Sequence, residues 1–288
     1  MPLSSSALTG PEAGEAAFIC VTCGTQFPPS ANPPDGCPIC LDDRQYVGHD
    51  GQQWTTLAEM RTHYHNNFYP VEAGVTGIIT EPKFGIGQRA FLIETDNGNM
   101  LWETLTYLDE TTIAEIERRG GIKAISLSHP HYYSTMNEWS HALGNVPIHL
   151  PELDRRYVMR VGPNIDFWSG DTLEIMPGLT IIRCAGHFPG AAVLHWADGA
   201  NGKGALFCGD TLQVVADRDW VSFMYSYPNT IPLDPGSIRH IIDVLEPFDY
   251  DIVYGAFGGI VRGDGKEKVR RSAERYLRHI EDPSSNAE

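Results

Sequence analysis

Two Cys-x-x-Cys pairs near the start of the chain constrain its folding more than any other feature. The pairs are Cys20 with Cys23 and Cys37 with Cys40, and residues 24–36 separate them. Each pair can form a knuckle, and four thiolates together make a closed tetrahedral site for zinc. The segment around them has few apolar residues and could not fold on a core of its own. We therefore expect a metal ion to supply most of its stability.

Two disulfides are the alternative for these four cysteines. The start of the chain, MPLSSSALTGPEAGEAA, lacks the basic end and the apolar stretch of a secretion signal, which favours zinc and a cytoplasmic location. The knuckles CVTCG and CPIC also resemble those of rubredoxin, where iron carries electrons, although the loop between them is much shorter here. We predict a rubredoxin-like zinc ribbon with four cysteine ligands over residues 18–48, after a disordered tail over residues 1–17.

The composition of the 288 residues limits the kinds of partner that the chain can have. The formal net charge is −16, and an acidic protein repels phosphate backbones, so the sequence argues against a nucleic-acid partner. No run of about 18 apolar residues is present, so we expect no membrane-spanning segment. With 42% hydrophobic residues, the chain can form one large core beside the small cysteine module.

Strand and helix patterns alternate along the rest of the chain. The hydrophobic patterns and turn signals predict helices over 54–68 and 111–121 and further helices after Thr135, Asp234 and Asp264. They predict strands over 74–80, 89–95, 99–105, 122–128, 179–186, 191–197, 204–210 and 250–259. The stretch DNGN, 96–99, is the expected hairpin turn. Thr135 and Glu138 could form a capping box. The alternation predicts an α/β sandwich with a main domain over 49–282 and a short tail over 283–288.

Polar residues with metal-binding side chains follow three of the expected strands. His129 and His131 come at the end of IKAISLS, His187 lies in the turn CAGHFPG, and Asp210 ends GALFCGD. Because side chains alternate along a strand, His129 and His131 should point the same way and share one ion. Taken alone, each motif is weak, because many buried histidines only donate hydrogen bonds within a core.

Taken in order, these motifs resemble those of the metallo-β-lactamase superfamily, over roughly residues 70–280. That family carries H-x-H-x-D-H after a strand, then G-H-x-P-G, then G-D, then a late G-H-G. The resemblance implies an αββα sandwich, and it makes His129, His131, His187 and Asp210 the ligands of the family's first metal site.

The resemblance also implies that the second metal site is missing. Tyr133 and Ser134 stand where the family has its Asp-His ligands, and Ala256 or Phe257 stands where it has the late histidine. One divalent cation with three neutral histidines and one carboxylate carries a single net positive charge, which a bound hydroxide cancels. A second cation would lack ligands and face uncompensated repulsion. We therefore expect a mononuclear site.

Hydrolysis is the first functional hypothesis. A metal-bound hydroxide would attack an ester, thioester, lactone or amide, since zinc lowers the pKa of its water to about 7. Tyr133 would then stand near the metal as the catalytic donor to an oxyanion or a leaving group, or else simply fill the vacant second site.

Two alternatives stay open. The family includes persulfide dioxygenases, so one iron at the first site could act on a persulfide or another thiol. The chain could also be a non-catalytic, metal-binding member of the family. The aromatic stretch after Asp210, with Trp220, Phe223, Tyr225 and Tyr227, is a candidate substrate wall that would favour an uncharged or acyl small molecule. Core packing or an interface of a homo-oligomer is the alternative.

Overall fold

The computed structural model describes residues 15–281, and this part of the chain divides into two compact units. The first unit comprises the described residues of Met1–Leu150 together with Arg155–Phe167, and the second comprises those of Pro151–Asp154 and Trp168–Glu288. Each unit combines a β-sheet with helices, which confirms the α/β class. The predicted tails over 1–17 and 283–288 lie largely outside the described residues, and Ala16 pairs with Ser30 through backbone hydrogen bonds of 2.9 and 3.1 Å.

In the described part of the first unit, seven strands form one sheet in the order β3-β4-β5-β6-β7-β8-β9. The strands are β3 (His65–Glu72), β4 (Val75–Glu81), β5 (Ala90–Thr95), β6 (Gly98–Trp102), β7 (Ala124–Ser126), β8 (Ile148–Pro151) and β9 (Ile165–Trp168). Strands β3 to β6 are antiparallel, whereas β6–β7 and β7–β8 are parallel pairs. Parallel neighbours need crossover connections, and these contain helices α2 (Glu110–Arg118) and α3 (Met136–Ala142).

In the described part of the second unit, the main sheet has six strands in the order β10-β11-β12-β13-β18-β19. They are β10 (Thr172–Met176), β11 (Leu179–Arg183), β12 (Ala192–Trp196), β13 (Ala205–Phe207), β18 (Ile252–Tyr254) and β19 (Ile260–Arg262). Between β13 and β18 the chain forms two short antiparallel pairs, which are β14 (Gln213–Val214) with β15 (Val221–Ser222) and β16 (Met224–Ser226) with β17 (Ile231–Pro232). A short helical turn, α4 (Gly199–Gly202), precedes β13.

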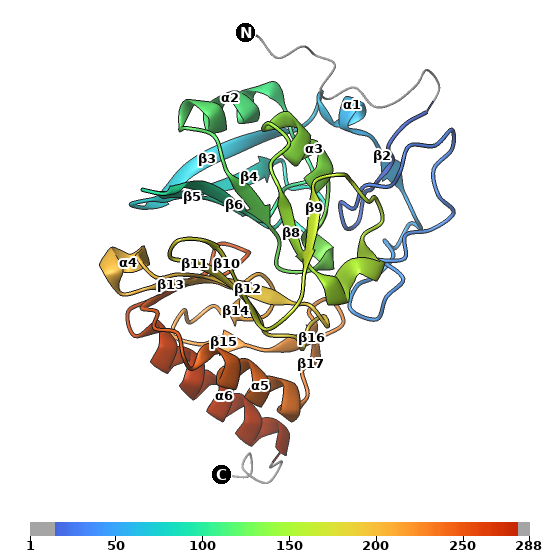
Figure 1. The fold of residues 1–288 in the computed structure, drawn as a ribbon. Helices are drawn as coiled ribbons and strands as arrows, with labels where there is room; N and C mark the ends of the chain where they lie inside the picture. The colour runs from blue at the N-terminus through green and yellow to red at the C-terminus, as the bar shows by residue number, and fades with distance from the viewer. Residues whose placement is uncertain (1–14, 282–288) are drawn as a thin grey trace. The chain divides into compact units, whose positions relative to one another are not determined.

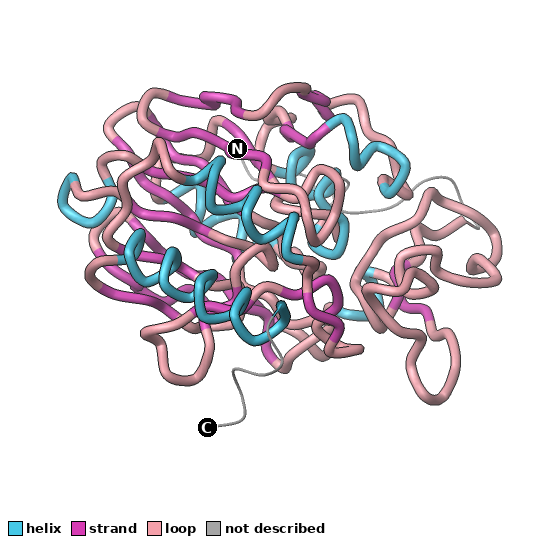
Figure 2. The backbone as a smooth tube through the Cα atoms, turned by 90° about the horizontal axis from the view of Figure 1, so that it is seen from below, coloured by secondary structure: helices cyan, strands magenta, loops and turns pink. Residues whose placement is uncertain are grey.

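Helices α5 (Pro235–Leu245) and α6 (Gly265–Glu281) pack side by side against the sheet of the second unit (Figure 1). Figure 2 shows the same pair of helices from below, in front of the strands. Asp234 caps α5 as predicted, since its Oδ1 accepts a hydrogen bond of 3.0 Å from the amide of Ser237. The buried face of α5 presents Ile238, Ile241 and Leu245 to the core. Within residues 15–281, no helix is long and apolar enough to cross a membrane.

Residues 54–68 differ from the single helix expected there. Trp54–Thr55 is a short strand, β2, which pairs with β1 (Ile19–Cys20), and the helix α1 is limited to Leu57–Met60. Thr56 and Glu59 form a complete capping box at its start. Strand β3 then begins at His65 and pairs with β4 along its length. The longer helix was a wrong prediction, because sheet pairing outweighs the local helix propensity of this stretch.

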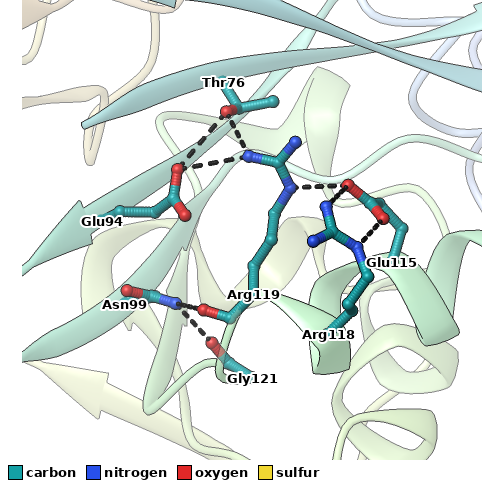
Figure 3. Close-up of polar contacts among 7 residues, drawn as sticks. All are labelled: Thr76, Glu94, Asn99, Glu115, Arg118, Arg119 and Gly121. Atoms are coloured by element: carbon teal, nitrogen blue, oxygen red, sulfur yellow. Dashed lines mark hydrogen bonds and ion pairs between the residues drawn. The ribbon is translucent and has the colours of Figure 1, made fainter. Parts of the chain in front are cut away.

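Arg119 fixes the end of α2 against the sheet of the first unit. Its guanidinium lies 2.7 Å from the Glu115 carboxylate and 3.4 Å from that of Glu94, and donates to Thr76 Oγ1 at 3.0 Å (Figure 3). Hydrogen bonds from Arg118 and then from Arg119 lower the pKa of Glu115 to about 2. This network holds α2 against the sheet, and none of its residues is a candidate site residue.

Candidate metal centres

The four predicted cysteine ligands lie together in the first unit. Their sulfur atoms all lie within 4.8 Å of one another, and the Sγ atoms of Cys20 and Cys40, like those of Cys23 and Cys37, are 3.6 Å apart. All four side chains are buried, and no disulfide joins any cysteine in the described part of the chain. Sulfurs at this spacing can each reach one zinc ion at about 2.3 Å. The arrangement favours a metal site over two disulfides.

Local hydrogen bonds shape the two knuckles of this cysteine group. The amide of Gly24 donates to the Cys20 carbonyl at 2.8 Å, and in the second knuckle the amide of Leu41 donates to the Cys37 carbonyl at 3.0 Å. Gln52 links the knuckles, because its Nε2 donates to Cys20 Sγ and its Oε1 accepts from the Cys37 amide, both at 3.2 Å. Gln52 was not predicted, since it lies outside the cysteine motif and no spacing rule marks it.

The charge balance of the cysteine group also calls for a cation. The neighbouring thiols, Cys20 first, raise the pKa of Cys23 well above its ordinary value, and burial adds to the shift. Four buried thiols cannot all ionise together without a cation, because burial and like-charge repulsion both disfavour the thiolates. A bound divalent metal removes that obstacle, and four sulfur donors suit zinc or iron.

The cysteine group is enclosed by apolar side chains from distant parts of the first unit. Its buried neighbours are Phe27 and Ile39, and the partly buried side chains that pack against it are Val47, Trp54, Ile86, Tyr157 and Met159. All of these partly buried side chains except Val47 lie outside residues 18–48. The cysteine segment has few apolar residues of its own. Side chains from the rest of the first unit therefore supply much of the apolar packing around it.

His129 and His131 lie together in the first unit, but not on a strand. Strand β7 ends at Ser126, His129 is extended with φ −169° and ψ 169°, and His131 lies in the 3-10 helix η2 (Pro130–Tyr132). Their ring centroids are 5.1 Å apart, and both side chains are buried. The expected convergence is therefore present, but a tight turn at Pro130 brings the rings together rather than the alternation of a strand.

The neighbouring backbone and side chains orient this histidine pair. His129 Nδ1 lies 2.8 Å from Ser128 Oγ, within hydrogen-bond distance. The amide of Ser128 donates to both carboxylate oxygens of the buried Glu103, at 3.3 and 3.1 Å. The carboxylate thus fixes the backbone immediately before the histidines.

His187 and Asp210 lie together in the second unit. His187 follows β11 in a turn where Ala185 and Gly186 both have positive φ, and Asp210 follows β13. His187 Nε2 and Asp210 Oδ2 are 3.9 Å apart, which is too long for a hydrogen bond but suits two atoms that each lie about 2.0–2.2 Å from one ion. Both side chains are buried.

Strand β16 and the residue after it contact both of these residues. His187 Nδ1 lies 3.2 Å from the Met224 carbonyl, which can only accept, so Nδ1 carries the proton and Nε2 keeps its lone pair in the neutral ring. The Tyr227 hydroxyl donates to the Asp210 carbonyl at 2.8 Å. Burial raises the pKa of Tyr227 well above its ordinary value, so this hydroxyl stays protonated and able to donate.

His129, His131, His187 and Asp210 make up the second of the two metal-capable groups in residues 15–281, beside the cysteine group. All four are buried. Three imidazoles and a carboxylate are a donor set that suits zinc and also Fe(II). We call these four residues the histidine group.

The residues that stand where a second metal would need ligands are not metal-binding side chains. Tyr133 is only 2% exposed and Ser134 is buried, whereas Phe257 is 43% exposed. Ser134 has a positive φ of 31°. In the aromatic stretch after Asp210, Phe223 is fully buried in the core of the second unit, as the core-packing alternative predicted. Trp220 lies under the guanidinium groups of Arg271 and Arg275, whereas the Tyr227 ring lies 5.8 Å from that of His187.

Cys184, Cys208 and His195 lie outside both metal-capable groups and pack within the second unit. Cys184 and Cys208 are buried in the core of the second unit, where burial raises the pKa of both thiols. His195 Nε2 lies 2.8 Å from the Asp249 carbonyl, and burial lowers its pKa. The contact and the burial make His195 a hydrogen-bonded core histidine.

Comparison with known families and proteins gives consistent matches. The family model described as "Metallo-beta-lactamase superfamily" matches residues 85–256. The "Uncharacterized protein YmaE" of Bacillus subtilis (strain 168) is 48% identical to this chain over 265 residues, which cover 91% of this chain and 96% of that protein.

Solved structures of metallo-β-lactamases have a similar fold. VMB-1 superposes with a TM-score of 0.56 at 16% identity, covering 75% of this chain and 98% of its own. The metallo-β-lactamase from Hirschia baltica gives a TM-score of 0.52 at 19% identity, covering 73% of this chain and 96% of its own. The αββα metallo-β-lactamase fold predicted from the ordered motifs is therefore confirmed, with a four-cysteine cluster compatible with a small ribbon before it.

Proposed function

This chain belongs to the metallo-β-lactamase superfamily, and from that premise we propose that it is a metal-dependent hydrolase with a mononuclear zinc site. The bond attacked is that of an ester, thioester, lactone or amide. The observation that carries the proposal is the histidine group, in which every residue that matches the first-site motifs of the family is part of one metal-capable set.

The protein contacts of the histidine group support a role in metal binding. The Met224 carbonyl fixes the tautomer of His187 that leaves Nε2 for an ion, and Ser128 lies against Nδ1 of His129. Contacts of this kind to the outer nitrogen are typical of histidines that bind metals, because they set the ring orientation and raise its basicity.

A single ion is the number that this donor set supports. Three neutral histidines and Asp210 leave one net positive charge around a divalent cation, which hydroxide cancels. Tyr133, Ser134 and either Ala256 or Phe257 stand at the positions where the family resemblance places the ligands of a second ion, and none of them is a usual metal ligand. A second cation would meet uncompensated repulsion.

When bound, a zinc ion lowers the pKa of its water to about 7 and polarises a carbonyl. We assign Tyr133 the catalytic role of donating a hydrogen bond to the oxyanion or the leaving group. Its position supports this role, because its amide bonds to the Pro130 carbonyl at 3.3 Å and so holds it just after His131. Its side chain is buried, where a hydrogen bond to developing charge is stronger than in water.

The substrate we propose is a small molecule that is uncharged or carries an acyl group. The net charge of −16 supports this choice, since it disfavours anionic polymers. A cytoplasmic location and a homo-oligomeric state stay predictions from the sequence.

Elemental analysis and a panel of acyl substrates test the proposal together. We expect two metal equivalents per chain, of which one belongs to the cysteine group, and turnover of at least one ester, thioester, lactone or amide. Two ions in the histidine group would contradict the mononuclear site. Turnover that needs oxygen, with iron in the purified protein, would instead support a dioxygenase acting on a persulfide or thiol. Metal binding without any turnover would support a non-catalytic member of the family.

A further inference from the structure

The first knuckle of the cysteine group is bonded to the loop that follows the histidine pair. The amide of Gln26 donates to the Ser134 carbonyl at 3.2 Å. Thr106, which follows β6, donates through Oγ1 to the Gly24 carbonyl at 3.3 Å. Both contacts lie within the first unit. The first joins the knuckle to the residue after Tyr133, and the second joins it to Thr106, whose carbonyl accepts a hydrogen bond from Thr135.

The contact at Gly24 leaves no room for a side chain. Gly24 has a φ of +82°, and a Cβ added there would lie 2.1 Å from Thr106 Oγ1. On another side of the knuckle, a Cβ added at Gly85 would lie 3.4 Å from the Gly24 nitrogen. The knuckle therefore packs closely against the chain after β6.

Hydrogen bonds from the chain after β6 hold the same loop from another side. Thr104 Oγ1 and Ser134 Oγ are 2.8 Å apart, and Thr135 Oγ1 lies 3.1 Å from the Leu105 carbonyl and 2.9 Å from that of Thr106. Ser134 adopts a positive φ of 31°, a backbone conformation that residues other than glycine rarely adopt without support from neighbouring groups. These bonds provide that support.

We propose that the cysteine module is a positioning element for the loop 132–135, and through it for Tyr133. Gln26 and Gly24 are the positioning residues, because they hold Ser134 and Thr106 by their backbone. In this chain, hydrogen bonds from the module hold the loop at the positions where the family resemblance places ligands of a second metal ion. The proposal rests on the proposed function, since the placement of Tyr133 matters to a reaction only if the histidine group is catalytic.

Hydrogen exchange of the metal-bound full-length protein tests the positioning role with a matched pair of variants. Gly24→Ala inserts a methyl group against Thr106, whereas Gly51→Ala changes a glycine with a similar positive φ, +86°, that meets nothing within 4 Å. We expect the amides of residues 130–137 to exchange about tenfold faster or more in Gly24→Ala and at the wild-type rate in Gly51→Ala. Unchanged exchange of residues 130–137 in Gly24→Ala would overturn the proposal.

A second substitution separates positioning from general damage. Thr106→Ala in the Gly24→Ala background removes the atom at 2.1 Å and leaves the Cβ of residue 106 at 3.3 Å, so exchange of residues 130–137 should be slower than in Gly24→Ala alone. It should stay faster than in the wild type, because the bond from Thr106 Oγ1 to the Gly24 carbonyl is also lost. If Gly24→Ala does not fold, Thr106→Val alone removes the bond to the Gly24 carbonyl and should still speed exchange in this loop. No change in Thr106→Val would then overturn the proposal.

Metal affinity distinguishes this proposal from the proposed function. Competition with a chelator for the ion of the histidine group should show weaker binding in Gly24→Ala than in Gly51→Ala. If the exchange of residues 130–137 responds as expected while wild-type protein binds no metal at the histidine group, the positioning role holds and the proposed function fails. If the histidine group binds its ion and neither exchange nor affinity responds, the positioning role fails alone.

Discussion

The two metal-capable groups found within residues 15–281 are built in opposite ways. The cysteine group takes its ligands from two knuckles between Cys20 and Cys40, so a short piece of chain specifies it. The histidine group takes its ligands from separate places between His129 and Asp210, after strands β7, β11 and β13. The spacing of residues in the sequence specifies the cysteine group, whereas the histidine group depends on the fold of the strands that precede its residues.

The two groups also differ in how much the surrounding protein orients their side chains. The side chains of the histidine group are oriented by protein partners, such as the Met224 carbonyl for His187 and the Ser128 hydroxyl for His129. Between residues 18 and 48 the cysteine knuckles have one two-residue strand, β1, and few apolar residues, so the metal itself must supply much of their stability. Loss of the metal should therefore unfold one group and leave the other folded.

The largest effect is expected from Cys37→Ser. This variant should lose one metal equivalent, and the amides of residues 18–48 should exchange at nearly the rate of an unfolded chain, while the second unit still unfolds cooperatively. Cys184→Ser, which changes a buried cysteine outside both groups, should keep both metals. Elemental analysis and hydrogen exchange are the measurements. Unchanged exchange of residues 18–48 in Cys37→Ser would mean that no metal stabilises this module.

His187→Ala should have the opposite signature. We expect loss of one metal equivalent and of turnover, with the cysteine metal in place and residues 18–48 still protected from exchange. His195→Ala is the matched control, because it also removes a buried histidine of the second unit but should retain both metals. A His187→Ala protein that keeps two metal equivalents would exclude His187 as a ligand.

Tyr133→Phe should affect the reaction and not the metal. Loss of one donor to the transition state typically lowers the rate by about 10²–10³. We expect that decrease in kcat, with two metal equivalents still bound and with KM little changed. A wild-type kcat would show that the ring only fills space beside the histidine group.

A smaller effect is expected from Tyr227→Phe, which removes the hydroxyl that donates to the Asp210 carbonyl. Partners of metal ligands typically contribute about 10- to 100-fold in metal affinity. Chelator competition should show that decrease for the histidine group alone, with the cysteine metal as the internal control. Equal weakening of both metals would indicate a general loss of stability instead.

The smallest effect concerns Glu115, in a region that contains neither group. Its pKa is lowered from 4.5 to about 2, first by Arg118 and then by Arg119. The ion pairs therefore stabilise the protein above about pH 4.5 and are lost as the pH falls toward 2. Since these side chains reach solvent, we expect Glu115→Gln to cost less than about 1 kcal/mol at pH 7 and nothing near pH 2. Denaturant unfolding at both pH values measures this, and a cost that does not depend on pH would contradict it.

Features set by neighbouring residues could be predicted from the sequence. The hairpin between β5 and β6 turns at Asp96 and Asn97, with Thr95 opposite Gly98, as DNGN indicated. Asp234 caps α5, and the cysteine group forms as its spacing predicted. The ordered His and Asp motifs also identified the family, because their sequence positions are tied to the ends of particular strands.

Features set by distant contacts could not be predicted. Thr135 does not form the expected capping box, because its hydroxyl bonds to the Leu105 and Thr106 carbonyls instead. Phe223 fits an exposed aromatic wall as well as a core when only its neighbours in sequence are known. Tyr227 contacts Asp210, and Gln52 contacts Cys20 and Cys37. Neither contact follows from a local sequence pattern.

The packing of the cysteine knuckles also bears on the order in which the protein assembles during synthesis. All four ligands have left the ribosome once residue 40 and the residues that fill the exit tunnel have been made, so the knuckles can capture an ion early. Tyr157 and Met159, which pack against them, emerge much later. We therefore expect the nascent chain to bind the metal first and to pack the knuckles against Tyr157 and Met159 later. A shortage of metal would then impair folding before the first sheet is complete.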